Sequence, residues 1–215
     1  MNLCEYLKRE RILPVAEVEA VGQAVDLGRA LIAAGLGCVE ITFRTAAAAE
    51  AITAITGSVP ELTVGAGTVR TVDQVDTAIE AGARFLVAPG LNPVVVERAK
   101  AQGVPMLPGV CTPTEIEQAE SLGFQLLKFF PAEASGGVAF LKALAGPYPE
   151  VAFVPTGSIG PSNLASYLAL RNVVACAGSW MVPTGLIAQS DFASITDLAA
   201  QARALATAIG ESEST

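Results

Sequence analysis

The sequence predicts an α/β fold, a single (β/α)8 TIM barrel. Short apolar segments alternate with helix signals at a spacing of about 20 to 25 residues, as in βαβ units. The 215 residues are enough for one undivided barrel. Apolar residues make up 52% of the chain and the mean hydropathy is +0.50, which suits parallel strands covered by helices on both faces.

Capping residues and glycines mark the expected helices. An apolar stripe at 21–32 indicates the first, and three later helices begin at residues that cap helix N-termini. These starts are Thr71 with Gln74, Asn92 with Pro93, and Thr112 with Pro113 and Glu115, and the four helices end at Gly35, Gly82, Gly103 and Gly123.

Apolar runs between these helices give eight expected strands, which is the number a (β/α)8 barrel requires. They are residues 12–15, 39–43, 62–66, 85–88, 105–107, 126–129, 151–154 and 173–177. Residues 198–209 predict a closing amphipathic helix, and 211–215 a mobile polar tail, so that one domain spans 1–215. The alternative is an open doubly wound sheet, but the first βα turn lacks the glycine fingerprint of a dinucleotide binder.

Composition excludes several classes of protein. A net charge of −8 argues against a nucleic-acid partner, which needs a basic face. No apolar run reaches the length of a membrane span, and residues 1–11 lack the apolar stretch of a signal peptide. We therefore expect a soluble, cytoplasmic protein with no membrane association.

Cysteine and histidine usage limits the possible chemistry. Cys4, Cys38, Cys111 and Cys176 are dispersed without metal-ligand spacing, so we expect no metal site and read them as small buried hydrophobes in a reducing compartment. The chain has no histidine, which excludes Ser-His-Asp and Cys-His catalysis. Carboxylates, lysine and tyrosine remain for proton transfer.

Lys128 stands in the middle of an apolar, strand-prone segment, residues 125–131. Strand alternation places Lys128 on one face with Leu126 and Phe130, and the residues between them on the other face. If both faces are buried, loss of water favours the free, nucleophilic amine, which is the form that makes a Schiff base. The alternative is an edge strand whose lysine extends into solvent.

The second expected strand carries opposite charges on one face. Alternation turns Glu40, Thr42 and Arg44 toward the barrel interior. Buried charges are costly unless they are paired or used in function. One interpretation is a structural Glu40–Arg44 ion pair. We favour the other, in which Glu40 is a proton shuttle and Arg44 anchors a carboxylate.

Active-site groups in such barrels lie at the carboxyl ends of the strands. The third strand leads into Thr68 and the fourth into Pro89, each of which is either a pocket residue or part of a turn. After strands seven and eight come a glycine-bearing turn at 156–162 that is expected to open a helix, and Gly-Ser-Trp at 178–180. Barrels commonly bind phosphate there through backbone amides and a helix N-terminus, which would let an acidic protein hold a phosphorylated substrate.

Together these segments resemble the 2-keto-3-deoxy-6-phosphogluconate (KDPG) aldolase family of class I aldolases. The matching segments are VEITFRT (39–45), VGAGTV (64–69), PG (89–90), PG (108–109), KFFPAE (128–133), PTG (155–157) and GSW (178–180). The resemblance implies a barrel, usually a homotrimer, that needs no metal or other cofactor. It also implies cleavage of KDPG to pyruvate and glyceraldehyde 3-phosphate, and many members also act on 4-hydroxy-2-oxoglutarate.

The resemblance also implies a role for each site residue. Lys128 is similar to the Schiff-base lysine and Glu40 to the acid/base. The implied binding residues are Arg44 and Thr68 at the pyruvate carboxylate, Pro89 and Phe130 on the pocket wall, Thr156 near C4, and Gly157, Ser158 and Ser179 at the phosphate. One departure is Ser158, because the family pattern has Gly-Gly-Ile at this turn. Its Cβ either narrows the phosphate loop or its hydroxyl supplies a donor.

These roles imply a mechanism in which Lys128 attacks the C2 ketone and the iminium accepts electrons. Glu40, directly or through water, removes the C4 hydroxyl proton, the C3–C4 bond breaks, and the enamine is protonated and hydrolysed. Two alternatives stay open. One is the same chemistry on 4-hydroxy-2-oxoglutarate or 2-keto-3-deoxy-6-phosphogalactonate. The other is a non-catalytic phosphate-binding barrel in which Lys128 and Glu40 form a buried pair.

Overall fold

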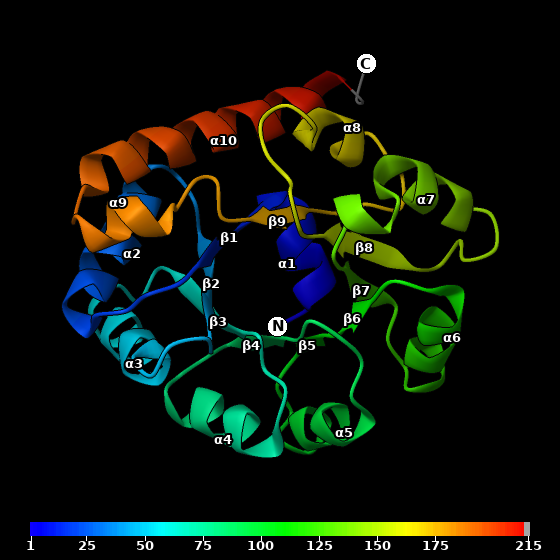
Figure 1. Ribbon diagram of the computed structural model, residues 1–215, viewed down its shortest axis with the longest axis horizontal. Helices are drawn as coiled ribbons and strands as arrows, with labels where there is room; N and C mark the ends of the chain where they lie inside the picture. Colours follow the sequence, from blue (N-terminus) through cyan, green and yellow to red (C-terminus); the bar gives the residue numbers. More distant parts are fainter. Residues whose placement is uncertain (213–215) are drawn as a thin grey trace.

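Parallel strands form the centre of the molecule and helices surround them (Figure 1). The computed structural model describes residues 1–212, the last three without their side chains. The strands are β1 (Ile12–Ala16), β2 (Cys38–Thr42), β3 (Thr63–Gly67), β4 (Phe85–Val87), β5 (Met106–Leu107), β6 (Gly109–Val110), β7 (Leu126–Phe129), β8 (Ala152–Pro155) and β9 (Cys176–Gly178). Each of the predicted strands has a counterpart among them.

The strands close into a ring. One sheet has the order β5-β4-β3-β2-β1-β9 and the other β6-β7-β8, with parallel pairing throughout. Bridges from Phe153 to Val173 and from Thr156 to Ala177 join β8 to the last strand. Pro108 alone separates β5 from β6, because proline has no N–H to donate to a neighbouring strand; the fifth predicted strand, 105–107, corresponds to β5, and β6 was not predicted. The (β/α)8 barrel is thereby confirmed and the open sheet is wrong.

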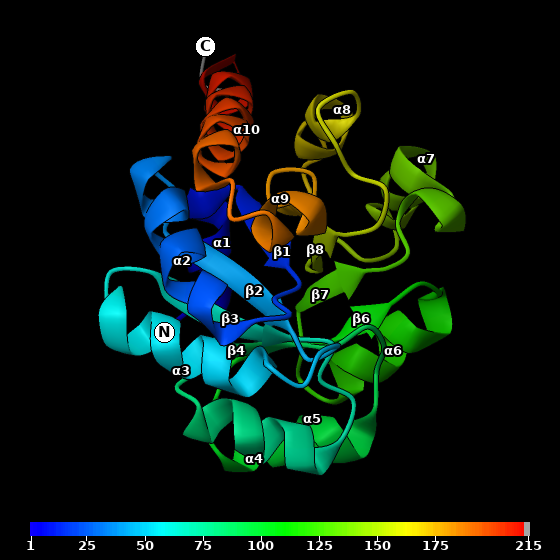
Figure 2. The same cartoon turned by 60° about the vertical axis from the view of Figure 1, so that its left-hand side comes forward.

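Apart from α1, the helices cover the outside of this ring, as the turned view shows (Figure 2). They are α1 (Leu3–Glu10), α2 (Ala24–Ala33), α3 (Ala48–Ser58), α4 (Val72–Glu80), α5 (Pro93–Ala101), α6 (Pro113–Ser121), α7 (Gly137–Leu144), α8 (Leu164–Leu168), α9 (Thr184–Ala188) and α10 (Phe192–Ser212), with 3-10 turns η1 (Val21–Gln23) and η2 (Glu133–Ser135).

The predicted helix boundaries are confirmed by hydrogen bonds at the caps. The side chains of Thr71, Asn92 and Thr112 accept bonds from the backbone of α4, α5 and α6, and Thr112 forms a full capping box with Glu115. The glycines expected to end four helices, Gly35, Gly82, Gly103 and Gly123, all have positive φ.

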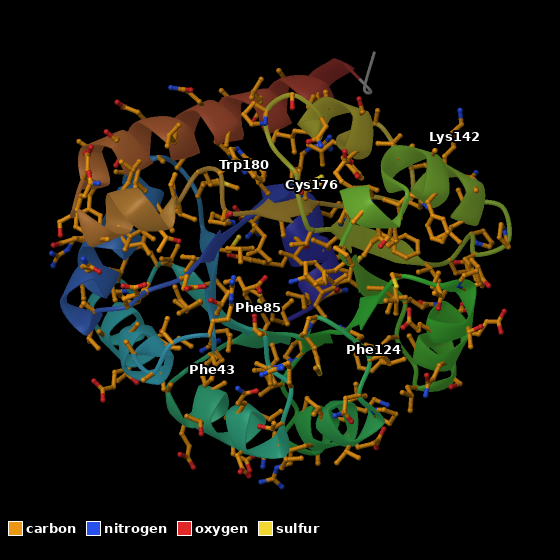
Figure 3. The ribbon with its side chains drawn as sticks, viewed as in Figure 1. Phe43, Phe85, Phe124, Lys142, Cys176 and Trp180 are labelled. Carbon is orange, nitrogen blue, oxygen red and sulfur yellow. The ribbon has the colours of Figure 1, made fainter. Side chains whose placement is uncertain are left out.

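Helix α1 was not predicted, because residues 1–11 are mostly polar. Its buried residues Leu3 and Leu7 pack inside the barrel with a cluster that includes Leu13, Phe85 and Val154. Phe85 points into the middle of the ring (Figure 3). Since α1 immediately precedes β1, it covers the end of the barrel where the strands begin, and the opposite end remains for a site.

Helix α10 closes the chain and begins earlier than predicted, at Phe192 rather than near 198. It reaches Ser212, so residues 211 and 212 of the expected tail are helical, while 213–215 lie outside the described residues and their mobility stays a prediction. Within residues 1–212, no helix has the length and apolarity to cross a membrane. Cys38 and Cys176 are buried, and burial raises the pKa of both thiols, whereas Cys4 and Cys111 are partly exposed rather than buried.

We predict that Gly109→Ala weakens the fold. A Cβ on Gly109 would lie 2.3 Å from the carbonyl oxygen of Pro89, so one of two backbone segments must move. Such overpacking costs about 1 to 3 kcal/mol of unfolding free energy, measured by urea denaturation. The matched control is Gly146→Ala, whose Cβ meets nothing within 4 Å. Equal midpoints for the two variants would contradict the prediction.

Candidate active site

A cavity of about 700 Å³ lies at the carboxyl ends of the strands. Its wall includes every residue that the sequence predicted for the site. They are Glu40, Arg44, Thr68, Pro89, Lys128, Phe130, Thr156, Gly157, Ser158 and Ser179. The structure thus brings them together in one place, while the roles assigned to them stay predictions.

Strand β7 holds Lys128 in the cavity wall. The neighbours Leu127 and Phe129 point outward into the core, where Phe129 stacks on Phe140 of α7 with ring centroids 5.5 Å apart. Lys128 and Phe130 face the cavity, and the Lys128 Nζ lies 5.4 Å from the centre of the Phe130 ring. The side chain of Lys128 is 7% exposed, so the solvent-extended alternative is wrong.

Glu40 of β2 meets Lys128 across the interior. Its Oε1 lies 3.5 Å from the Lys128 Nζ, and the Glu40 side chain is 1% exposed. Neither carboxylate oxygen of Glu40 makes a hydrogen bond with any group in the described part of the chain. A buried amine beside a buried carboxylate allows direct proton exchange between them. The pair does not fill the cavity, which stays open beside it.

Gly67 of β3 makes room for this carboxylate. A Cβ at Gly67 would lie 2.0 Å from Glu40 Oε1 and 2.5 Å from its Cγ, which is closer than real atoms approach. The absence of a side chain at Gly67 therefore serves a side chain of the neighbouring strand.

Arg44 pairs with a different carboxylate from the one considered in the sequence. Its Nε lies 3.1 Å from Glu17 Oε2, so a Glu40–Arg44 ion pair is wrong. Arg44 follows the end of β2 and Glu17 follows the end of β1, so both stand at the rim of the cavity. The Arg44 side chain is 61% exposed, and contact through Nε leaves the two terminal nitrogens free to bind a carboxylate from two sides.

The turn at 157–163 forms the far wall. Ser158 has a φ of +58°, and the Asn163 side chain donates to the Ser158 carbonyl and accepts from the Gly160 N–H. The N–H groups of Ser158 and Ile159 make no bond with residues 1–212. As expected, this turn leads into a helix, but that helix, α8, begins only at Leu164 and has five residues. An anion here would meet loop amides and hydroxyls rather than a helix end.

Some lining residues were not assigned to the site from the sequence. These are Val15, Glu17, Thr42, Ile159, Gly178, Trp180 and Thr184. Trp180 lies in the loop between β9 and α9 (Figure 3). Inspection of the residue after every strand would have found Glu17, whereas Thr184 begins a short helix and leaves no such signal.

The fold and the cavity define a class of protein: a (β/α)8 barrel with a buried lysine and carboxylate where barrel enzymes have their active sites. A family model described as KDPG and KHG aldolase matches residues 3–198. The chain belongs to this family.

Similar proteins agree with the family model. The 2-dehydro-3-deoxy-phosphogluconate aldolase of Treponema pallidum (strain Nichols) is 51% identical over 201 residues, 94% of this chain and 96% of that protein. The KDPG aldolase of Legionella pneumophila, with pyruvate captured at low pH as a covalent carbinolamine, superposes with a TM-score of 0.91 at 34% identity, covering 94% and 98% of the two chains. The Zymomonas mobilis ZM4 enzyme with 3-phosphoglycerate has a TM-score of 0.88 at 39% identity, covering 94% and 95%.

We predict that Gly67→Ala damages the site without unfolding the barrel. The new methyl group must displace Glu40 from Lys128, and a shift of about 1 Å in a reacting group costs about 100-fold in rate. The measurement is the rate at which borohydride fixes pyruvate to the protein, with thermal unfolding recorded alongside. The control is Gly90→Ala, whose Cβ meets nothing within 4 Å. A Gly67→Ala protein that reacts at the unaltered rate contradicts the role of Gly67.

Proposed function

We propose that this protein is a class I aldolase that cleaves KDPG to pyruvate and glyceraldehyde 3-phosphate through a Schiff base on Lys128. The observation that carries the proposal is the buried Lys128 amine, 3.5 Å from Glu40 and open to a cavity. The pyruvate carbinolamine of the Legionella enzyme supports the same chemistry here.

The chemistry begins with proton transfer within the buried pair. Glu40 takes a proton from Lys128, and the free amine attacks the C2 ketone of the substrate. Glu40 returns this proton to the C2 hydroxyl, which leaves as water and gives an iminium ion. Glu40, directly or through water, then removes the C4 hydroxyl proton, and the C3–C4 bond breaks as its electrons move into the iminium. Protonation of the enamine at C3 and hydrolysis release pyruvate and restore the lysine.

The two ends of the cavity suit the two ends of the substrate. Arg44 and Thr68, both on the cavity wall, would hold the carboxylate next to C2, and Thr156 directly precedes the turn at 157–163. The unpaired amides of Ser158 and Ile159, with the hydroxyls of Ser158 and Ser179, would bind the phosphate. The bound 3-phosphoglycerate of the Zymomonas enzyme supports a phosphorylated ligand.

One observation favours a second substrate, 4-hydroxy-2-oxoglutarate. The cationic side chains among the described lining residues are Arg44 and Lys128, and both belong to the carboxylate and Schiff-base end. The cavity end beside the turn at 157–163 therefore offers only neutral hydrogen-bond donors among the described residues, and these can bind an unphosphorylated acid as well as a phosphorylated one. The 6-phosphogalactonate epimer differs at C4 and stays a further alternative.

We also infer a cytoplasmic homotrimer that uses no metal or other cofactor. The support for this is the resemblance of the sequence to the family, together with four cysteines that are all free, as in a reducing compartment. In residues 1–212, no cluster of three or more potential metal ligands occurs. These statements remain predictions.

We predict that Lys128→Ala abolishes the adduct that pyruvate and borohydride leave on the protein, because no amine remains in the cavity to form it. Intact mass and peptide mapping measure the adduct and its position. The control is Lys142→Ala on α7, whose side chain points away from the barrel (Figure 3) and should leave trapping unchanged. A Lys128→Ala protein that still traps pyruvate ends this assignment, and a natural protein that never traps it favours the non-catalytic barrel.

We predict that Ser158→Ala separates the two substrates. If the Ser158 hydroxyl donates to the phosphate, its loss raises the KM for KDPG about tenfold, as expected for a hydrogen bond to a charged group, and leaves the KM for 4-hydroxy-2-oxoglutarate unchanged. Alanine keeps the Cβ at the same positive φ, so only the hydroxyl is tested. If the KM of Ser158→Ala equals that of wild type for both substrates, the Ser158 hydroxyl does not contact the phosphate, and the backbone amides of the turn hold it without this hydroxyl.

A further inference from the structure

Thr42 is a buried hydroxyl of the cavity wall to which the mechanism gives no role. The residue is 3% exposed, and its Oγ1 makes no hydrogen bond with any group in residues 1–212. Buried hydroxyls in folded proteins are almost always paired. Thr42 lines the cavity, so its free donor and acceptor are available to a molecule bound there.

The position of Thr42 on β2 shows which part of such a molecule it meets. Glu40, Thr42 and Arg44 all line the cavity: Glu40 and Thr42 share a face of β2, which ends at Thr42, and Arg44 follows two residues later. Thr42 therefore stands, along the chain, between the carboxylate beside Lys128 and the guanidinium at the rim. In a 2-oxo acid, the carboxylate carbon and C2 are bonded neighbours. A ligand with C2 at Lys128 and its carboxylate at Arg44 must pass Thr42.

The neighbouring strand leaves this hydroxyl uncovered. Thr42 is in register with Gly67 on β3, which has no side chain to bond it. On the other side, the Glu17 carboxylate is held at 3.1 Å by Arg44. Arg44 is thus paired with Glu17, and Glu40 with Lys128. A bound ligand is the partner that remains for the Thr42 hydroxyl.

We infer that Thr42 is a substrate-binding residue whose hydroxyl donates a hydrogen bond to the C2 oxygen of the 2-oxo acid. This rests on the proposed function. Attack by the amine forms the Nζ–C2 bond and opens the C2–O π bond, and the proton lost by the amine moves to the oxygen. Thr42 holds that oxygen while it changes from carbonyl to hydroxyl, before the hydroxyl takes the proton held by Glu40 and leaves as water as the C2–O bond breaks.

A substrate-binding role for the Thr42 hydroxyl predicts that its loss weakens pyruvate binding without lowering the stability of the fold, whereas a structural role predicts lower stability. Valine has the shape of threonine without the hydroxyl. Because the hydroxyl has no partner in the protein, Thr42→Val should unfold at the same temperature or higher. The same substitution should weaken pyruvate binding, because the C2 oxygen loses its donor.

The test compares wild type, Thr42→Val and Thr42→Ser. The measurements are the pyruvate concentration that gives half-maximal borohydride trapping and the thermal unfolding midpoint without pyruvate. We expect the half-maximal concentration to rise about tenfold in Thr42→Val with no fall in the midpoint. Thr42→Ser keeps the hydroxyl and should stay within about threefold of wild type.

Two results would overturn the inference. The first is a half-maximal pyruvate concentration for Thr42→Val equal to that of wild type. The second is a lower unfolding midpoint together with a higher half-maximal concentration in both Thr42→Val and Thr42→Ser. If valine prevents folding, Thr42→Ala removes the same hydroxyl and is judged by the same concentration. Failure of the proposed function looks different, because wild type itself would then trap no pyruvate.

Discussion

The contact between Lys128 and Glu40 is the constraint on which the site depends. The two residues come from β7 and β2, which lie in different sheets on opposite sides of the ring. They meet only because the barrel is closed and narrow enough for two long side chains to span its interior. Removing both groups from water is costly, and their attraction offsets part of that cost. Gly67 removes the steric obstacle, so the position of the pair depends on three strands.

The charges of the cavity explain how an acidic protein is suited to an anionic ligand. The chain has a net charge of −8, yet the wall of the cavity carries two cations, Arg44 and Lys128, and two carboxylates, Glu17 and Glu40. Local neutrality at the site matters more than the net charge, because exposed charges further away are screened over about 10 Å. Recognition of a second anionic group then falls to amides and hydroxyls, whose strength depends on geometry.

Features that weaken folding gather at this cavity. Within residues 1–212, the buried side-chain oxygens of Glu40 and Thr42 make no hydrogen bond, and Thr68 and Ser158 adopt positive φ without being glycine. Each is unfavourable for the free protein and costs on the order of 1 to 3 kcal/mol. The rest of the barrel has an extensive buried core, and side chains cap the N-termini of α1, α4, α5 and α6, so the fold tolerates these costs. A bound ligand would form hydrogen bonds with the same side chains and backbone groups, so the features that lower the stability of the free protein are the ones that serve binding.

Local patterns in the sequence determined the barrel, the strands and three of the helix caps, and these patterns together with the family resemblance named ten of the residues around the cavity. Strand alternation and capping depend on neighbours in the chain, so Lys128 and Glu40 are recognised as inward-facing without knowledge of the fold. Contacts between distant segments were decided by the tertiary structure alone. The pairing of Arg44 with Glu17, the space that Gly67 leaves for Glu40, and the covering of the barrel end by residues 3–10 all require strands and helices to be brought together by ring closure. No pattern within one segment specifies which side chain of another segment will lie opposite.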